Sequence, residues 1–287
     1  MNWRLLAPMF ALVAAAFVAR TYYNASDTPL ILDTDDAMRM VVVRDLLAGQ
    51  DWFDNIQHRM NTPYGAELHW SRLADLPLAA IILVLRPLLG GMAETVAAYV
   101  VPLGLLFALV YLTGKATLRL VGPEGLLAAI VLPALSLTVL TEFVPGRLDH
   151  HSLQILLLMA MLWCGLESVR RARFAVGAGL AAATSMAIGV EGIPSAAAAA
   201  VAFGVIWIAD PARANALRGF GVSLALASVL HLTIALPPER WLVPACDAIS
   251  PVYAAVALAT GAVFVALSGL RLAGVVARLG AGVAGGL

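Results

Sequence analysis

The sequence predicts an all-α protein whose helices cross a membrane several times. Hydrophobic residues make up 61% of the 287 residues and charged residues only 13%, whereas soluble domains contain about 45–50% and about 25%. The mean hydropathy is +0.89. So few charges cannot cover a water-exposed surface of this size, which excludes an ordinary soluble protein. The formal net charge of +0 gives no reason to expect a nucleic-acid partner.

The first apolar run extends from Leu5 to about Val18 and leads to the tyrosine pair Tyr22 and Tyr23. Aromatic residues of this kind are typical of a membrane interface. Because Arg4 precedes an alanine-rich apolar core, a cleaved signal peptide is the alternative. We favour an uncleaved first helix.

Seven later apolar runs approach the length of about 20 residues that a transmembrane helix needs. We therefore expect a bundle of about eight spans, forming one transmembrane domain over residues 1–287. The seven runs cover residues 95–114, 125–142, 152–168, 174–190, 194–209, 217–236 and 252–270.

The apolar segment 76–89 decides the orientation of all later spans. It is short for a span and contains Arg86. If the chain starts in the cytoplasm and this segment does not cross, the basic connectors between the later spans all face the cytoplasm, as the positive-inside rule requires. We therefore predict that residues 76–89 form an interfacial helix on the outer surface. The long, acid-rich loop 24–93 then lies outside the membrane.

The same topology places the tripeptide Asp149-His150-His151 and the loop Pro237–Pro251 outside as well. Every Lys or Arg position except Lys115 is arginine, a bias typical of a GC-rich bacterial genome. We expect a multi-pass protein of the bacterial inner membrane with a cytoplasmic N-terminus. Its active site would face the periplasm or the exterior.

Three acids within four residues begin the external loop, in the segment Asp33-Thr34-Asp35-Asp36. Helix capping explains one or two of them, because Asp or Thr is favourable before a helix and acids are favourable in its first turn. Three carboxylates so close repel one another unless a cation or a proton joins them. Hard divalent cations bind such clusters, so a metal-binding or catalytic role is the second interpretation.

The tripeptide Asp149-His150-His151 precedes an apolar helix. Asp149 and His151 are two residues apart, a spacing that can place both side chains on one cation. Surface histidines are often merely solvated, but ionisable groups at the mouth of a span tend to be functional.

A third group follows the turn at Tyr64 and consists of His69 and Arg72. It is either part of an ordinary loop with an aromatic anchor or a binding site for an anionic phosphate, for which the planar guanidinium is well suited.

These motifs, taken in order, resemble those of the GT-C glycosyltransferases, and among them the catalytic subunits of oligosaccharyltransferases. In that family a first helix leads to an external loop with an Asp motif and a downstream arginine, here Asp36 and Arg44. An interfacial helix ends the loop, here residues 76–89. A second external motif follows two spans later, here Asp149-His150-His151, and archaeal members are similar in using Asp-x-His. The resemblance covers about residues 1–270, and the family's later glutamate loop and soluble C-terminal domain have no counterpart here.

The resemblance implies a membrane glycosyltransferase that takes a sugar from a polyprenyl-(di)phosphate donor. Its acceptor would be a protein or a glycan on the outer face, and membrane lipids would surround it. The catalytic residues would be Asp36, with Asp35, and Asp149, and one divalent cation (Mn²⁺ or Mg²⁺) would bind Asp36, Asp149 and His151. The residues that would contact the donor phosphate are His69, Arg72, His150 and Arg44.

Other interpretations stay open at the level of the sequence. Within the enzyme class, the acceptor could be a lipid or another glycan. A small-molecule transporter is an alternative of another class, although transporters place ionisable groups near the middle of the membrane. An inactive, truncated remnant of a longer enzyme is a third.

Overall fold

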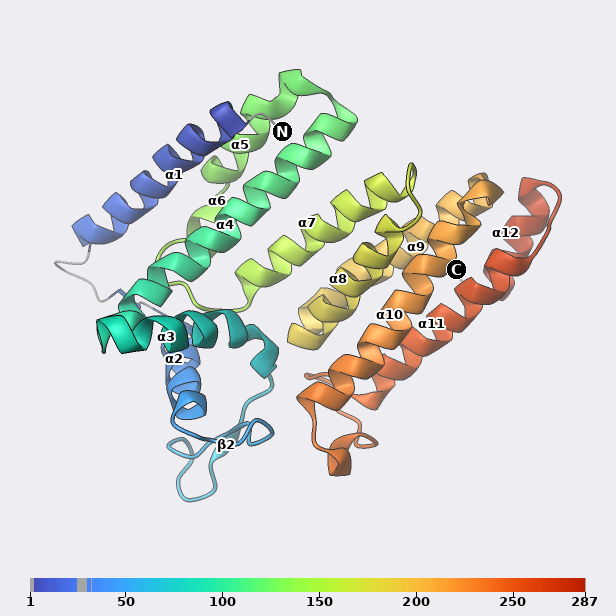
Figure 1. The fold of residues 1–287 in the computed structure, drawn as a ribbon. Coiled ribbons are helices and arrows are strands. Elements are labelled where there is room, and N and C mark those ends of the chain that lie inside the picture. Colours follow the sequence, from blue (N-terminus) through green and yellow to red (C-terminus); the bar gives the residue numbers. More distant parts are fainter. Residues whose placement is uncertain (1–2, 25–29, 32, 287) are drawn as a thin grey trace. The chain divides into compact units, whose positions relative to one another are not determined.

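The computed structural model describes residues 3–24, 30–31 and 33–286 (Figure 1). It is almost entirely helical, which confirms the predicted class of a polytopic helical membrane protein. The chain separates into two compact units, Met1–Leu68 with Arg72–Leu156, and His69–Ser71 with Leu157–Leu287. The prediction of one transmembrane domain over residues 1–287 stays a prediction.

The first unit contains six helices, the start of a seventh and one small hairpin within its described residues. The hairpin pairs β1 (Ile56–Gln57) antiparallel with β2 (Ala66–Glu67). The helices are α1 (Trp3–Asn24), α2 (Thr34–Leu47), α3 (Leu76–Leu89), α4 (Met92–Leu120), α5 (Leu126–Leu135), α6 (Leu137–Glu142) and the first turns of α7 (His151–Ser168).

Helices α2, α3 and α4 share one apolar core. Met40 and Val43 of α2 pack with Leu78 and Ile82 of α3 and with Ala97 of α4. The spacing of Met40 and Val43 on one face is that of an amphipathic helix. This core holds α2 in place, so that its first turn lies at a fixed position against the rest of the unit.

Helix α3 has the bounds predicted for the interfacial helix. It lies across the end of α4 rather than alongside it (Figure 1). It buries Leu78 and Ile82 while Leu83, Val84 and Leu88 are exposed. An apolar helix with an exposed apolar face is suited to lie in the plane of a membrane surface, although that position stays a prediction.

The predicted span 125–142 is divided in two. Helix α5 ends at Leu135 and α6 begins at Leu137, because Ser136 is extended, with φ −68° and ψ 129°. Pro133 lies in the last turn of α5, where its missing N–H removes a helical hydrogen bond. The backbone therefore bends close to the proline.

The second unit packs its helices through small residues. A Cβ atom on Gly261 of α11 would lie 2.7 Å from the carbonyl oxygen of Gly221 in α10. Such close approach is characteristic of helix packing in membranes. The helices of this unit are the remainder of α7, α8 (Phe174–Ile188), α9 (Ile193–Ala209), α10 (Ala214–Ala235), α11 (Pro251–Gly269) and α12 (Val275–Ala284).

All eight predicted spans are helical in the described chain, and six helical segments are long and apolar enough to cross a membrane. The two exceptions among the predicted spans are the divided pair α5 and α6 and the short helix α8. The six segments are Leu6–Asn24, Met92–Leu120, His151–Ser168, Val190–Ala209, Pro211–Ala235 and Pro251–Gly269.

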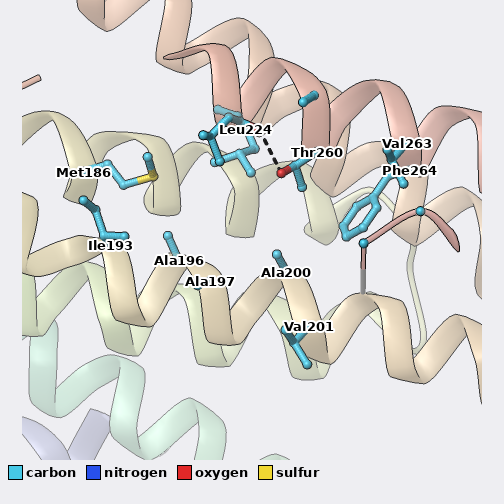
Figure 2. A pocket seen from close by; sticks show the side chains of 15 residues that line it. Met186, Ile193, Ala196, Ala197, Ala200, Val201, Leu224, Thr260, Val263 and Phe264 are labelled. Atoms are coloured by element: carbon cyan, nitrogen blue, oxygen red, sulfur yellow. Dashed lines mark hydrogen bonds between the residues drawn. The ribbon is translucent and has the colours of Figure 1, made fainter. Parts of the chain in front are cut away.

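An apolar cavity of about 370 Å³ lies within the second unit, between α9, α10, α11 and the end of α12 (Figure 2). None of the described residues that line it is charged. The hydroxyl of Thr260 donates a hydrogen bond to the backbone oxygen of Val256, so it is already satisfied. This cavity contains no group for acid–base or electrostatic chemistry, whereas several buried charged side chains lie close together in the first unit.

Candidate functional site

The first turn of α2 separates the acids of the Asp33-Thr34-Asp35-Asp36 segment. Asp33 is the N-cap, and its Oδ1 accepts a 3.0 Å hydrogen bond from the backbone N–H of Asp35. The capping interpretation is therefore correct for Asp33. Asp35 is exposed, while Asp36 is only 2% exposed. Of the two neighbouring aspartates predicted to be catalytic, Asp36 is therefore the buried one.

Asp36 binds the segment that carries the second motif. Its Oδ1 accepts hydrogen bonds from the backbone N–H groups of Leu148, at 2.7 Å, and Asp149, at 2.8 Å. Its Oδ2 lies 3.1 Å from Nη1 of Arg147. Two motifs more than one hundred residues apart thus meet in one place, as the resemblance implied.

The turn before Arg147 depends on glycine. Gly146 has a φ of +92°, and a Cβ atom there would lie 2.0 Å from the carbonyl oxygen of Leu30. Its N–H donates a 2.9 Å hydrogen bond to the carbonyl oxygen of Ala98 in α4. Only glycine allows this backbone conformation together with so close an approach, and the turn directs Arg147 toward Asp36.

Arg147 lies among four carboxylates, and these five residues are called here the Arg147 cluster. Its Nη1 lies 2.9 Å from Asp33 and 3.1 Å from Asp36, its Nε 3.1 Å from Glu142, and its Nη2 3.8 Å from Asp149. A role for Arg147 or for Glu142, and the pairing of Arg147 with Asp33, were not predicted from the sequence. The position of Arg147, two residues before Asp149, could have indicated this cluster, because an arginine that is buried beside such a motif needs acidic partners.

The second motif forms its own network around Asp149. Asp149 Oδ1 accepts a 2.7 Å hydrogen bond from the backbone N–H of His150 and lies 2.7 Å from Nδ1 of the same residue. Asp149 Oδ2 lies 3.3 Å from Nε2 of His151. His150 is buried and His151 is 40% exposed at its side chain. With Nδ1 directed at Asp149, His150 presents Nε2 as its second functional atom.

Arg39 is a second buried cation, and its role in the site was not predicted from the sequence. It stands three residues after Asp36 on α2 and is 1% exposed. Its Nη1 donates a 2.8 Å hydrogen bond to Asp75, the residue before α3, and its Nη2 lies 3.2 Å from Nδ1 of His150 and 3.5 Å from Asp149. Arg39 therefore links the start of α3 to the second motif through one side chain.

Burial and charge shift the pKa values of the acids in opposite directions. Burial raises the pKa of Asp36 above its usual range, although the amides and Arg147 oppose the shift. Burial also raises the pKa of Asp75. For Asp149, burial would raise the pKa, but the hydrogen bond and charge of His150 outweigh it and hold the pKa well below its usual range. Asp149 is therefore the acid of this site that is most firmly ionised.

Arg147 itself stays charged. Burial lowers its pKa, but the charge of Asp36 and the hydrogen bonds to Glu142 and Asp33 raise it further, so the net shift is upward. An arginine is in any case not deprotonated in proteins.

Three of the residues predicted to bind phosphate contact other groups in the structure. Arg44 forms an exposed ion pair with Glu94 and stands eight residues after Asp36 on α2, about 12 Å along the helix axis. Arg72 donates to the backbone oxygens of Trp52 and Asp54, which fixes the loop. His69 groups with the second unit, where its ring makes an edge contact with Trp70. Their roles in phosphate binding stay predictions.

The donor set predicted to bind a divalent cation contains the right types of atom, but Arg147 contacts two of the three residues. Carboxylate oxygens and imidazole are suitable ligands, and Asp36, Asp149 and His151 provide them. Both oxygens of Asp36 are already engaged by amides and Arg147. Within residues 3–24, 30–31 and 33–286, no three His, Cys, Asp or Glu side chains are grouped so as to hold a metal ion. A cation does not fit beside Arg147 in this arrangement.

A cavity of about 270 Å³ opens beside the Arg147 cluster. Asp33, Asp36 and Arg147 form its polar side, together with Arg20 of α1. The remaining wall is largely apolar and contains Leu30, Leu140, Val144 and Pro145. The cavity therefore combines two guanidinium groups with a hydrophobic surface next to the paired motifs.

No family model matches this sequence, and no curated protein matches it. One solved structure is similar in fold, the crystal structure of the Archaeoglobus fulgidus oligosaccharyltransferase in the apo form, with a TM-score of 0.68. The fold is oligosaccharyltransferase-like. The similarity covers 93% of this chain and 33% of that one, at 14% sequence identity. This chain thus spans about a third of the length of its structural neighbour, and the likeness concerns the fold.

Proposed function

We propose that this chain is the membrane-embedded part of a GT-C-type glycosyltransferase that uses a polyprenyl-(di)phosphate-linked sugar as donor. One observation carries the proposal: Asp36 of the first external loop and the Asp149 segment are hydrogen-bonded in one buried cluster, on a fold similar to that of an oligosaccharyltransferase. In the family that the sequence resembles, these two motifs together form the catalytic site.

The cavity beside the cluster suits such a donor. Its apolar wall, with Leu140 and Val144, would contact the first isoprene units, and Arg20 and Arg147 line the same space. Guanidinium groups bind phosphate oxygens through paired hydrogen bonds. The donor class therefore agrees with both the polar and the apolar surfaces of the cavity.

In the proposed reaction, an acceptor nucleophile attacks the anomeric carbon while the bond from that carbon to the phosphate oxygen breaks. The configuration would be inverted, as the resemblance implies. Arg147 and His150 would stabilise the negative charge that develops on the departing phosphate. Asp149 would orient the acceptor, and Asp36, whose pKa is raised by burial, would receive its proton. The acceptor would be a protein or a glycan on the outer face of a bacterial inner membrane.

The divalent cation predicted at Asp36, Asp149 and His151 remains part of the hypothesis. The reaction described for Arg147, His150 and the two aspartates does not require this cation. The experiment of the next section tests it separately.

The proposal is tested with the purified chain in lipid nanodiscs and a radiolabelled, short-chain polyprenyl-diphosphate N-acetylglucosamine. We expect saturable binding and slow release of polyprenyl diphosphate by hydrolysis, in which water takes the place of the acceptor and N-acetylglucosamine is freed. Asp149→Asn should lower the release rate by about 100-fold or more, a magnitude typical of a lost catalytic electrostatic contact. Asp247→Asn, at an exposed position of the loop Pro237–Pro251, is the matched control. Full release by the Asp149 variant, or no binding by the parent chain, would contradict the proposal.

A further inference from the structure

The carboxylates of the Arg147 cluster are neutralised by a side chain of the protein itself. Nη1 of Arg147 lies within 3.1 Å of both Asp33 and Asp36, and Nε lies 3.1 Å from Glu142. The guanidinium is only 17% exposed. A planar group with five donors can satisfy several carboxylates at once, and here it contacts acids at the start of α2 and at the end of α6.

A divalent cation would need the same oxygen atoms. Mg²⁺ binds oxygen at about 2.0–2.1 Å in near-octahedral geometry. A cation at that distance from Asp36 Oδ2, on the side that faces Arg147, would meet Nη1, which is 3.1 Å from the same oxygen. Both groups are positively charged, so repulsion adds to the steric conflict. The other Asp36 oxygen already accepts two backbone hydrogen bonds.

The remaining atoms of the predicted ligand set are close together. Asp149 Oδ2 lies 3.3 Å from Nε2 of His151 and 3.8 Å from Nη2 of Arg147. The guanidinium thus contacts Asp36 Oδ2 through Nη1 and Asp149 Oδ2 through Nη2, and Asp149 Oδ2 in turn is the neighbour of His151 Nε2. Asp36, Asp149 and His151 are the two carboxylates and the imidazole to which the resemblance assigns the metal.

We propose that Arg147 is the resident cation of this cluster and competes with divalent metal ions for Asp36 and Asp149. The guanidinium takes the position that the resemblance gives to a metal, and it sets how tightly a metal can bind. This role concerns the cluster alone and does not depend on sugar transfer.

The test is a Mn²⁺ titration of the purified chain, followed by calorimetry and by the electron paramagnetic resonance of free Mn²⁺. Arg147→Gln removes the charge and keeps a polar side chain of moderate size. We expect it to bind Mn²⁺ at least about tenfold more tightly than the parent chain. Asp36→Asn in the Arg147→Gln background should abolish the gain. Equal Mn²⁺ affinity of the parent chain and Arg147→Gln, whether tight or absent, would overturn the proposal.

Two further variants keep the test decisive if Arg147→Gln folds poorly. Arg147→Lys retains the charge but cannot bridge several carboxylates with one planar group, so its Mn²⁺ affinity should lie between those of the parent chain and Arg147→Gln. Glu142→Gln removes one acid that holds the guanidinium without touching the predicted metal ligands, and it should raise the affinity by a smaller factor. Sugar release measured on the same samples reports the proposed function separately, because Mn²⁺ binding is read without any substrate.

Discussion

The carboxylate of Asp36 accepts a 2.8 Å hydrogen bond from the backbone N–H of Asp149, 113 residues further along the chain. Through this contact, a side chain of the first motif fixes the backbone of the second motif. The adjacent N–H of Leu148 binds the same oxygen atom at 2.7 Å. Asp36 therefore has a structural role in the site, whatever chemistry the site performs.

We expect Asp36→Ala to destabilise the first unit strongly. The substitution leaves two buried N–H groups without their acceptor and removes one of the four carboxylates around Arg147. Removing one partner of a buried charged pair costs about 3–5 kcal/mol. Thermal unfolding in detergent, followed by circular dichroism, measures the loss. Asp35→Ala is the control, since Asp35 is the exposed neighbour on the same turn. Similar unfolding temperatures for both variants would show that the Asp36 contacts contribute little.

Arg39 and Asp75 form a pair that is almost completely removed from water, with exposures of 1% and 0%. Arg39→Ala leaves Asp75 buried without a partner, and we expect a loss of about 3–5 kcal/mol. The double variant Arg39→Met with Asp75→Leu should lose less than the sum of the two single variants, because no uncompensated charge remains.

Arg44 and Glu94 provide the comparison for this pair. They form an ion pair at the surface, with the Arg44 side chain 56% exposed, and exposed pairs contribute about 0–1 kcal/mol. Chemical denaturation of Arg44→Ala and Arg39→Ala in the same detergent should separate the two classes of pair. A larger effect at Arg44 would contradict the conclusion that the buried pair of Arg39 and Asp75 is the more stabilising one.

The stability of the first unit should depend on pH through Asp149. Its folded-state pKa lies well below the unfolded value, which is about 3.9 for an aspartate. The charged form is thus favoured by folding, and its contribution is fully present above pH of about 4–5 and is lost as the pH falls toward the folded-state pKa. Asp36 has the opposite effect on stability. Burial raises its pKa above the unfolded value, so protonation of Asp36 on acidification favours the folded state.

The measurement compares unfolding temperatures of the parent chain and Asp149→Asn between pH 6 and the lowest pH at which the detergent micelle is stable. We expect the parent chain to lose more stability on acidification than Asp149→Asn does. Parallel curves for the two proteins would mean that Asp149 does not titrate differently in the folded and unfolded states.

Sequence periodicity and charge predicted most of the helices, and the resemblance implied that the two motifs meet. The eight apolar runs correspond to helical segments, one of which is divided into α5 and α6, whereas α12 was not predicted. The bounds of α3 were predicted to the residue. Ser136 was missed as a break, because a single proline inside an apolar run does not by itself show whether a helix bends or ends. The shared compartment of Asp36 and Asp149 followed from the arginine distribution alone.

The partners of each charge could not be predicted in the same way. The resemblance pointed to Arg44 as the arginine downstream of Asp36, whereas Arg39 is the arginine of α2 that is buried beside the second motif. Which of two arginines on one helix points inward depends on the helix start, and the N-cap at Asp33 decides it. The role of Arg147 was not predicted because two of its partners, Asp33 and Asp36, lie more than one hundred residues earlier in the sequence.

The orientation in the membrane can be tested with the native cysteines. Cys246 is exposed and lies in the loop Pro237–Pro251, which the positive-inside argument places outside, while Cys164 is buried in α7. A membrane-impermeant maleimide should therefore label intact spheroplasts at Cys246. In a Cys246→Ser background, Glu124→Cys, an exposed position after α4, should react only after lysis. The reverse labelling pattern would mean that the orientation of the helices in the membrane is opposite to the predicted one. Because Asp149 and Cys246 are predicted to lie on the same side of the membrane, the Arg147 cluster would then face the cytoplasm.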